Sequence, residues 1–265
     1  MGADRTVWGT SRLSSGTVTY RIGQRGRTEV LAWAWGDGAA EFLDQIPHML
    51  CVDEDVADFR PSHPLIAEAH RRHPDLRMLR TGRVFESLVP AILEQKVHGI
   101  AAWRSWRKLV LEFGSPAPGP APAGLRVPPD AHTWRRIPSW TFHRANVDPQ
   151  RARTIVAAAQ LADKLEAATS EAGLRIVPGI GVWTAAETAQ RVFGDSDALS
   201  VGDFHLAAMV GWTLEGRPFD DAEMVEYLKP LQPHRHRAVR LLQAAGFAYK
   251  PKFGPRTPVT DHSRI

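Results

Sequence analysis

The chain has 265 residues, a length that fits one large domain or two modest ones. With 43% hydrophobic and 23% charged residues it has the composition of a globular protein, which excludes wholesale disorder, collagen-like repeats and an isolated coiled coil. A single cysteine, Cys51, excludes a disulfide scaffold, a four-thiolate iron–sulfur cluster and a cysteine-based zinc site within the chain. No apolar run approaches the ~18 residues of a membrane span, and residues 1–20 lack an apolar signal core, so we expect a cytoplasmic protein without a membrane partner.

The charge is distributed unevenly along the sequence. The net charge of +4 arises from 33 Lys and Arg against 29 Asp and Glu, and 27 of the cations are Arg, a bias that we ascribe first to a GC-rich genome and second to phosphate recognition. Residues 36–59 hold seven carboxylates and no Lys or Arg, whereas residues 70–110 hold nine cations against three acids and residues 228–259 hold seven cations alone. The basic stretches predict a face for a polyanion, with a solvated basic surface as the alternative, and we expect the acidic segment to point away from phosphate.

The N-terminal part of the chain has the pattern of a small antiparallel sheet. Residues 16–22 and 28–35 are rich in β-branched and aromatic residues and are bracketed by glycines, as strands of hairpins often are. We expect these strands in a small N-terminal α+β domain that comprises residues 1–78.

From residue 83 onward the hydrophobic periodicity becomes helical. One apolar stripe at helical spacing is made by Phe85, Leu88, Val89, Ile92 and Leu93, and a second by Trp103, Trp106, Val110 and Phe113. Residues 114–130 hold six prolines and three glycines, which predicts an extended loop. Further helices are predicted at residues 151–168, 183–193, 203–212, 221–229 and 234–245. The fold class is therefore mainly α, with a helical body at residues 79–265 that follows the small β portion.

A glycine-rich turn between two helical segments is the most informative feature. Pro178, Gly179 and Gly181 lie within a few residues just before the helix predicted from Trp183. Glycine permits positive φ and close approach of another molecule, so the backbone amides of this turn can face outward as a seat for an anion. A plain interhelical turn is the alternative.

This stretch, PGIGVWTA, followed 20 residues after its Trp by the Asp of VGD, resembles the helix-hairpin-helix DNA glycosylase superfamily. The upstream segment LVPAILEQKV, residues 88–97, is similar to the segment that precedes the flipped-base pocket in that family. The resemblance covers residues 79–245, and its nearest branch is that of DNA-3-methyladenine glycosylase II. It implies a helical body of two lobes with a cleft between them, preceded by a small antiparallel sheet.

The resemblance also implies a reaction and a site. The expected partner is double-stranded DNA with a damaged base, and Val177, Gly179, Ile180 and Gly181 would contact its backbone. Asp203 holds the catalytic position, where its carboxylate would stabilise the sugar cation or activate water after the base has flipped out; a helix N-cap is its alternative role.

Trp183 stands where bifunctional glycosylase/lyases of the superfamily carry a nucleophilic lysine. The resemblance therefore implies a monofunctional enzyme of base excision repair without lyase activity, and an indole wall that suits a positively charged alkylated purine such as 3-methyladenine. Core packing is the alternative for Trp183.

Two further residues of the expected base pocket depart from the branch. Glu187 replaces an aromatic residue one helical turn after Trp183, and it is predicted either to pair with a cationic base or to face water. His234 stands where an aromatic tryptophan is expected. These departures leave room for another lesion, so a glycosylase for a deaminated or oxidised base and a noncatalytic lesion- or abasic-site-binding protein remain alternatives.

Gln95 and Lys96, at the junction of two predicted helices, are candidates for the wedge that fills the gap left by the flipped base; Lys96 is also a candidate phosphate ligand, and a surface turn is the alternative. The pairs His70–His73 and His234–His236 lack third and fourth ligands, so we predict surface histidines and no metal site. No cofactor is expected, although a monovalent cation at the hairpin is compatible with the family. The resemblance suggests a monomer associated with the nucleoid.

Overall fold

The computed structural model describes residues 6–26, 29–249 and 261. Contacts within the chain define two units: one contains the described residues of Met1–Met49, Ile92–Lys164 and Thr260–Ile265, and the other those of Leu50–Ala91 and Leu165–Val259. Each unit therefore draws on separate stretches of sequence. The domain boundary expected after residue 78 stays a prediction, because a division by contacts does not test which segment folds independently.

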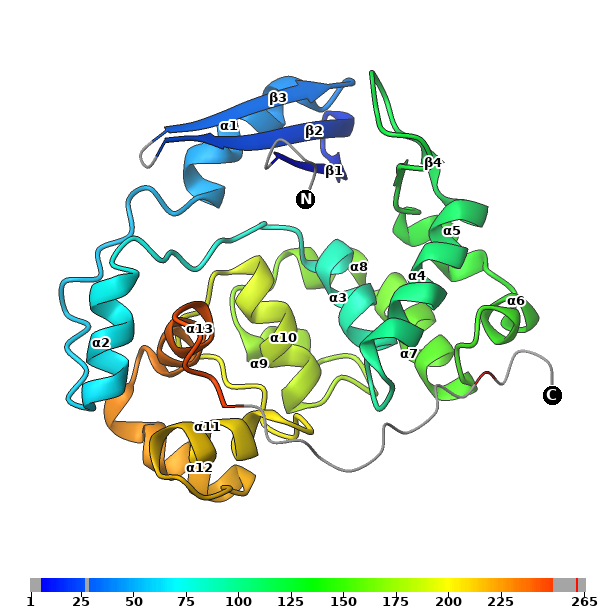
Figure 1. Ribbon diagram of the computed structural model, residues 1–265. Coiled ribbons are helices and arrows are strands. Elements are labelled where there is room, and N and C mark those ends of the chain that lie inside the picture. Colours follow the sequence, from blue (N-terminus) through cyan, green and yellow to red (C-terminus); the bar gives the residue numbers. More distant parts are fainter. Residues whose placement is uncertain (1–5, 27–28, 250–260, 262–265) are drawn as a thin grey trace. The chain divides into compact units, whose positions relative to one another are not determined.

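The first unit begins with an antiparallel sheet, in the order β1-β2-β3 (Figure 1). Its strands are β1 (Thr6–Leu13), β2 (Gly16–Arg25) and β3 (Glu29–Trp35). Helix α1 (Ala39–Met49) packs on the sheet through Phe42, whose ring stacks on that of Tyr20 with centroids 4.4 Å apart. The predicted sheet is confirmed, and β1 is an addition to it, since its glycine and hydroxyl residues weaken the strand pattern.

The helices of the first unit surround a buried tryptophan, Trp134, which is 1% exposed and stacks with Trp106 and Phe142. These helices are α4 (Gly99–Phe113), α5 (Ala131–Arg136), α6 (Ser139–Arg144) and α7 (Pro149–Gln160). The proline-rich segment between α4 and α5 is not helical, as predicted, and contains the short pair β4 (Ser115–Pro116) and β5 (Arg126–Val127).

Two predictions for this unit need correction. The helix expected over residues 151–168 is two helices, α7 and α8 (Ala162–Glu166), which break at Leu161. The predicted stripe of α4 is also wrong in part, because small and aliphatic residues form its buried side and Trp103 is 57% exposed.

Helix α3 (Val84–Leu93) runs from one unit into the other, and all five residues of its predicted stripe are buried. The second unit is otherwise made of α2 (Pro64–Arg72), α9 (Glu171–Leu174), α10 (Val182–Val192), α11 (Leu206–Leu214), α12 (Asp221–Leu228), the 3-10 turn η1 (Lys229–Leu231) and α13 (Arg235–Ala244). Its core packs α2, α11, α12 and α13 together through aliphatic side chains such as Ile66, Val210, Met224 and Leu242.

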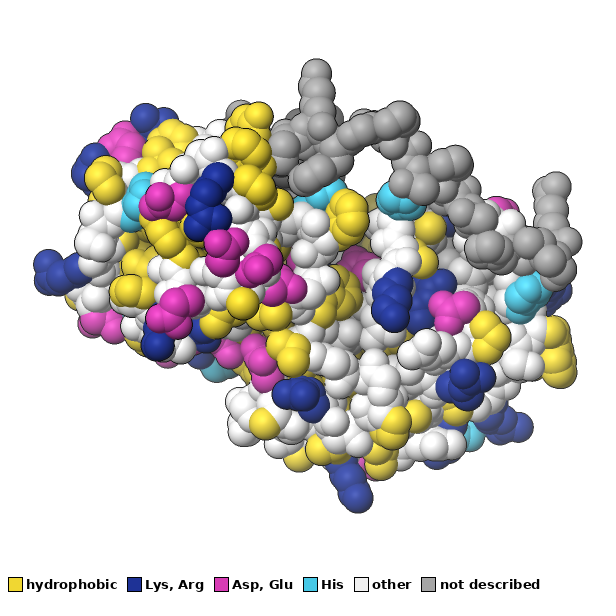
Figure 2. Space-filling model, turned by 90° about the horizontal axis from the view of Figure 1, so that it is seen from below, with side chains coloured by type: hydrophobic (Ala, Val, Ile, Leu, Met, Phe, Trp, Pro, Cys, Tyr) yellow, Lys and Arg dark blue, Asp and Glu magenta, His cyan; other side chains and the backbone are white. Residues whose placement is uncertain are grey.

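The mainly α fold class with a small antiparallel sheet is thus confirmed. Within the described part of the chain, no helix is both long enough and apolar enough to cross a membrane. On the face in Figure 2, the described Lys and Arg side chains are dispersed among acidic and hydrophobic ones rather than gathered into one stripe.

Candidate active site

The predicted hairpin is a tight turn between α9 and α10. The amide of Ile180 donates to the carbonyl of Val177 over 3.1 Å, with Pro178 second and Gly179 third in the turn, and Gly179 has φ +94°. This is the pattern of a type II turn, which favours Pro and Gly at those two positions. Val177 and Ile180 are 1% and 5% exposed, so two apolar side chains anchor the turn in the core while its tip stays at the surface.

The amide of Ile180 is already used inside the turn, so it is not available to an anion. The amides that α10 leaves without an intrahelical partner are those of its first turn, which starts at the N-cap Gly181. A side chain at Gly181 would meet no described atom within 4 Å, and its φ of −89° suits any residue. Nothing in the described part of the chain therefore requires a glycine there.

Asp203 lies in the loop between α10 and α11, and its two carboxylate oxygens have different partners. Oδ1 accepts hydrogen bonds from the amides of His205 and Leu206 at 2.8 and 2.9 Å, where α11 begins. Oδ2 lies 3.3 Å from the indole Nε1–H of Trp183, which donates to it. The N-cap of α11 is His205, so Asp203 binds the backbone just ahead of the helix through one oxygen, and its other oxygen faces the tryptophan.

Buried hydrogen bonds from side chains of α10 fix the loop that carries Asp203. Ser200 is 4% exposed, and its hydroxyl donates to Glu187 Oε1 and accepts from Gln190 Nε2 at 3.0 Å. The same amide of Gln190 donates to the carbonyl of Ala198 at 3.0 Å. The Ser200 carbonyl in turn accepts from the Asp203 amide at 3.1 Å, so side chains of α10 fix the backbone beside the carboxylate.

Glu187 does not simply face water. Beyond its bond from Ser200, its Oε2 pairs with Arg191 at 2.8 Å, one helical turn along α10, and its side chain is 18% exposed. Both oxygens therefore have partners within the chain. Contact of Glu187 with a base stays a prediction, and the geometry makes Glu187 a support of the Asp203 loop.

His234 is also buried, which corrects its assignment as a surface histidine. It is 9% exposed, its Nε2 lies 3.2 Å from Asp58 Oδ1, and its ring meets that of Phe59 edge-on at 5.1 Å. The ring of Phe59 meets His70 in the same way at 5.3 Å. Burial, followed by the charge of Arg237, lowers the pKa of His70.

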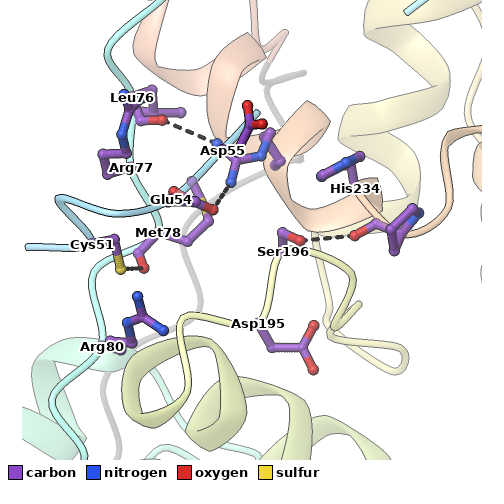
Figure 3. Close-up of polar contacts among 12 residues, drawn as sticks. Cys51, Glu54, Asp55, Leu76, Arg77, Met78, Arg80, Asp195, Ser196 and His234 are labelled. Carbon is purple, nitrogen blue, oxygen red and sulfur yellow. Dashed lines mark hydrogen bonds and ion pairs between the residues drawn. The ribbon is translucent and has the colours of Figure 1, made fainter. Parts of the chain in front are cut away.

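The acidic and basic segments meet each other instead of forming opposite faces. Arg237 is 2% exposed, pairs with Glu54 and donates to the carbonyl of Leu76 at 3.1 Å (Figure 3). Asp53 pairs with Arg80 at 3.0 Å. Several carboxylates of residues 36–59 thus bind cationic or imidazole groups of the same unit.

Two further cations of the C-terminal basic stretch also pair with carboxylates, whereas the exposed Arg240 donates to the neutral Gln243 Oε1 at 2.8 Å. Arg235 binds Asp197 through two nitrogens, with Nε–Oδ1 at 2.8 Å. Burial by itself would raise the pKa of Asp197, but the hydrogen bonds from the side chain and the backbone of Arg235 outweigh it and lower that pKa. Lys229 pairs with Glu226 at 3.3 Å. Lys250, Lys252 and Arg256 lie outside the described residues. Three of the four described cations of this stretch are therefore paired with carboxylates, and the polyanion face stays a prediction.

Gln95 and Lys96 follow α3 in the first unit, where Lys96 has φ +54° and Gln95 donates its amide to Ile92 at 3.2 Å. Asp203 and Trp183 belong to the second unit, so the wedge role stays a prediction. Among the described residues, no group of three His, Cys, Asp or Glu side chains is arranged to hold a metal ion.

Comparison with known proteins finds neighbours by structure alone. No family model and no curated protein matches the sequence. The 3-methyladenine DNA glycosylase from Archaeoglobus fulgidus is similar with a TM-score of 0.71 and 16% identity, over 91% of this chain and 87% of that one. The 8-oxoguanine glycosylase/lyase of Clostridium acetobutylicum gives 0.67 and 13%, over 92% and 89%.

The 3-methyladenine DNA glycosylase of Schizosaccharomyces pombe, solved with abasic DNA, gives a TM-score of 0.51 and 16% identity over 77% of this chain and 98% of that one. At such identities the likeness is one of fold. The chain therefore has the fold of the helix-hairpin-helix DNA glycosylases.

Proposed function

We propose that this chain is a monofunctional DNA glycosylase of base excision repair, which hydrolyses the bond between a damaged base and its deoxyribose. The observation that carries this proposal is the 3.3 Å approach of the Trp183 indole to Asp203 Oδ2, because it joins an aromatic ring and a carboxylate that are 20 residues apart in sequence. The fold shared with solved DNA glycosylases supports the same conclusion.

The chemistry requires an anion beside the sugar. When the N-glycosidic bond breaks, its electron pair leaves on the base nitrogen, and positive charge develops at C1′ and the ring oxygen of the deoxyribose. Asp203 Oδ2 would stabilise that charge and orient a water molecule. The water oxygen then bonds to C1′, its proton passes to Asp203 or to solvent, and the products are the free base and an abasic site.

Trp183 supports a hydrolytic rather than a lyase reaction. A lyase of this superfamily uses an amine at this position, and an indole cannot form a Schiff base. The second unit, which holds Trp183 and Asp203, has one described lysine, Lys229, and its ammonium group pairs with Glu226.

We infer that the substrate is an alkylated purine flipped from duplex DNA. Such a base carries positive charge, which an aromatic face attracts by about 0.5–2 kcal/mol, and its labile bond needs little help from an acid. An oxidised base is the second candidate, because an 8-oxoguanine glycosylase/lyase shares the fold with a TM-score of 0.67.

DNA would reach this site through the hairpin. The open space around Gly181 lets a phosphate approach the first amides of α10, where the helix dipole favours an anion. A hairpin carbonyl and the phosphate are compatible with a monovalent cation between them. We expect the protein to act as a monomer on the chromosome in the cytoplasm.

The test is the release of free bases from a panel of duplexes that contain methylated purines, 8-oxoguanine or deaminated bases. We expect 3-methyladenine and 7-methylguanine to appear, strand breaks only after alkali, and no covalent adduct after borohydride treatment. Release of 8-oxoguanine alone would favour the second candidate. Tight binding to abasic DNA without release of any base would identify a noncatalytic binding protein instead.

A further inference from the structure

Helix α4 of the first unit has an outer face that its own core does not use. Its buried side is made of Ala101, Ala102, Ser105, Leu109 and Val110. On the other side Trp103 is 57% exposed, and Arg104, Arg107 and Lys108 are exposed as well. We call these four residues the α4 outer face.

The arginines of this face carry charge that the described residues do not neutralise. Neither Arg104 nor Arg107 has an ion pair or hydrogen bond within the described part of the chain, whereas the nearby Glu112 pairs with Arg144 at 3.4 Å. Lys108 donates to the carbonyl of Arg144, a neutral group, and so keeps its charge. Glu112 therefore lies near four cations, Arg104, Arg107, Lys108 and Arg144, and its carboxylate is already paired with Arg144.

The surrounding sequence strengthens this local excess. Residues 92–164 hold eleven Lys and Arg against five Asp and Glu, a net charge of +6, which exceeds the +4 of the whole chain. The rest of the chain is therefore net acidic by two charges. The second unit, which contains the basic C-terminal stretch, is net acidic by those two charges, so the positive excess of the chain belongs to the first unit.

The shape of the face suits one class of partner. Trp103, Leu111 and the side chains of Arg104, Arg107, Lys108 and Glu112 line a shallow hollow of about 540 Å³. An apolar floor edged by guanidinium and ammonium groups matches a deoxyribose with its flanking phosphates, because guanidinium binds phosphate in a bidentate way. DNA matches the face better than an acidic protein segment does, because a strand presents a phosphate at every nucleotide, whereas Asp and Glu are depleted at the centre of protein–protein interfaces.

We propose that the α4 outer face binds the sugar–phosphate backbone of DNA, as a contact additional to the hairpin. Arg104 and Arg107 would each hold a phosphate, and the Trp103 ring would pack on a sugar. The inference rests on the proposed function in that the polyanion is taken to be DNA. The proposal gives the exposed cations of α4, which the sequence shows only as part of a basic stretch, a specific ligand.

The experiment measures the Kd of undamaged duplex DNA across a series of salt concentrations. Neutralising two phosphate contacts in the Arg104→Gln/Arg107→Gln variant should weaken binding about tenfold and reduce the slope of log K against log salt by about 2. Trp103→Ala should weaken binding with the slope unchanged, because it removes packing and no charge.

The matched control is Arg135→Gln/Arg136→Gln, which removes two exposed arginines of α5 in the same unit and should leave the slope near that of the wild type. An unchanged slope in the α4 variant would overturn the proposal, as would an equal loss in the control. So would α4 variants that lose affinity for polyglutamate but keep their affinity for DNA.

Excision separates this inference from the proposed function. With enzyme in excess over a damaged duplex and at saturating concentration, the α4 variant should release base at the wild-type rate. A salt slope lowered by the α4 variant, in a protein that excises no base, would support the surface and contradict the enzyme.

Discussion

Helices α4 and α13 are both rich in arginine, yet they use it in opposite ways. In α13, Arg237 is 2% exposed against Glu54, and Arg235 is 18% exposed in its side chain against Asp197. In α4, Arg104 and Arg107 are exposed, and neither has a carboxylate partner among the described residues. The difference is set by carboxylates far away in sequence, which the fold brings to α13.

The comparison shows why a run of cations predicts little by itself. Glu54 lies in the acidic segment that was expected to point away from phosphate, and it is the partner of Arg237, the most buried described cation of the basic stretch. A charge buried in this way serves folding, because an unpaired buried charge is costly, whereas an exposed one is available to a ligand. The following variants test that division.

Replacing Arg237 with Gln should destabilise the protein by about 3 kcal/mol, because Glu54 would keep its charge in a partly buried site without its cation. Chemical denaturation measures the free energy of unfolding. The double variant Arg237→Gln/Glu54→Gln should recover part of the loss. If the single variant unfolds like the wild type, Arg237 is not the structural cation that its burial indicates.

Ser200→Ala should cost about 1–3 kcal/mol, because Glu187 and Gln190 lose a buried partner. We also expect kcat for base release to fall with little change in KM for DNA, since the loop at Asp203 loosens. Ser105→Ala is the matched control: Ser105 is 2% exposed and bonds the carbonyl of Ala101 in the other unit. Loss of stability without loss of kcat in Ser200→Ala would restrict Ser200 to folding.

His236 should make α13 sensitive to acid. Burial, followed by the charges of Arg240, Arg191 and Arg237, lowers its pKa to about 4. Between about pH 6.5 and pH 4 the unfolded chain therefore binds a proton that the folded chain does not, and stability falls as the pH falls. From pH 7 to pH 5 this amounts to about 1–2 kcal/mol. His236→Gln should lose less stability over that interval, and an identical loss would contradict the shift.

The Arg104→Gln/Arg107→Gln variant should change the free energy of unfolding by less than about 0.5 kcal/mol, because exposed side chains without partners contribute little to stability. The same variant should reduce the slope of log K against log salt for DNA binding by about 2. A large loss of stability here would mean that α4 and α13 do not differ in the way proposed.

Periodicity predicted the helices well where one face of a helix is buried. The α3 stripe and the extents of α10, α12 and α13 follow from apolar spacing that local sequence contains. The same reasoning placed Trp103 inside, because aromatic residues dominate a hydrophobic pattern even where small residues such as Ala101 and Ala102 make the actual contact. Short helices such as α5 and α6 have too few turns for a period to appear.

The site was predictable to the level of its motif and no further. The Pro178–Gly179 turn is local enough for its residues to indicate it, whereas Trp183 and Asp203 were singled out by the family resemblance and their contact was not predicted. The buried position of His234 against Phe59 and the hold of Ser200 on Glu187 depend on which segments pack together, which no spacing encodes. The hydroxyl of Ser200, three residues before Asp203, gave no signal that distinguished it from any loop serine.

The most direct test of the account is the single-turnover rate of base release from methylated duplex DNA by Asp203→Asn. Asparagine keeps an oxygen for the amides of His205 and Leu206, so the variant should fold. Asp220→Asn is the matched control, since Asp220 caps α12 through the Glu223 amide at 2.8 Å. We predict a loss of about 100-fold or more for Asp203→Asn and a wild-type rate for Asp220→Asn. Equal rates in Asp203→Asn and the wild type would contradict the assignment of Asp203 as the catalytic carboxylate.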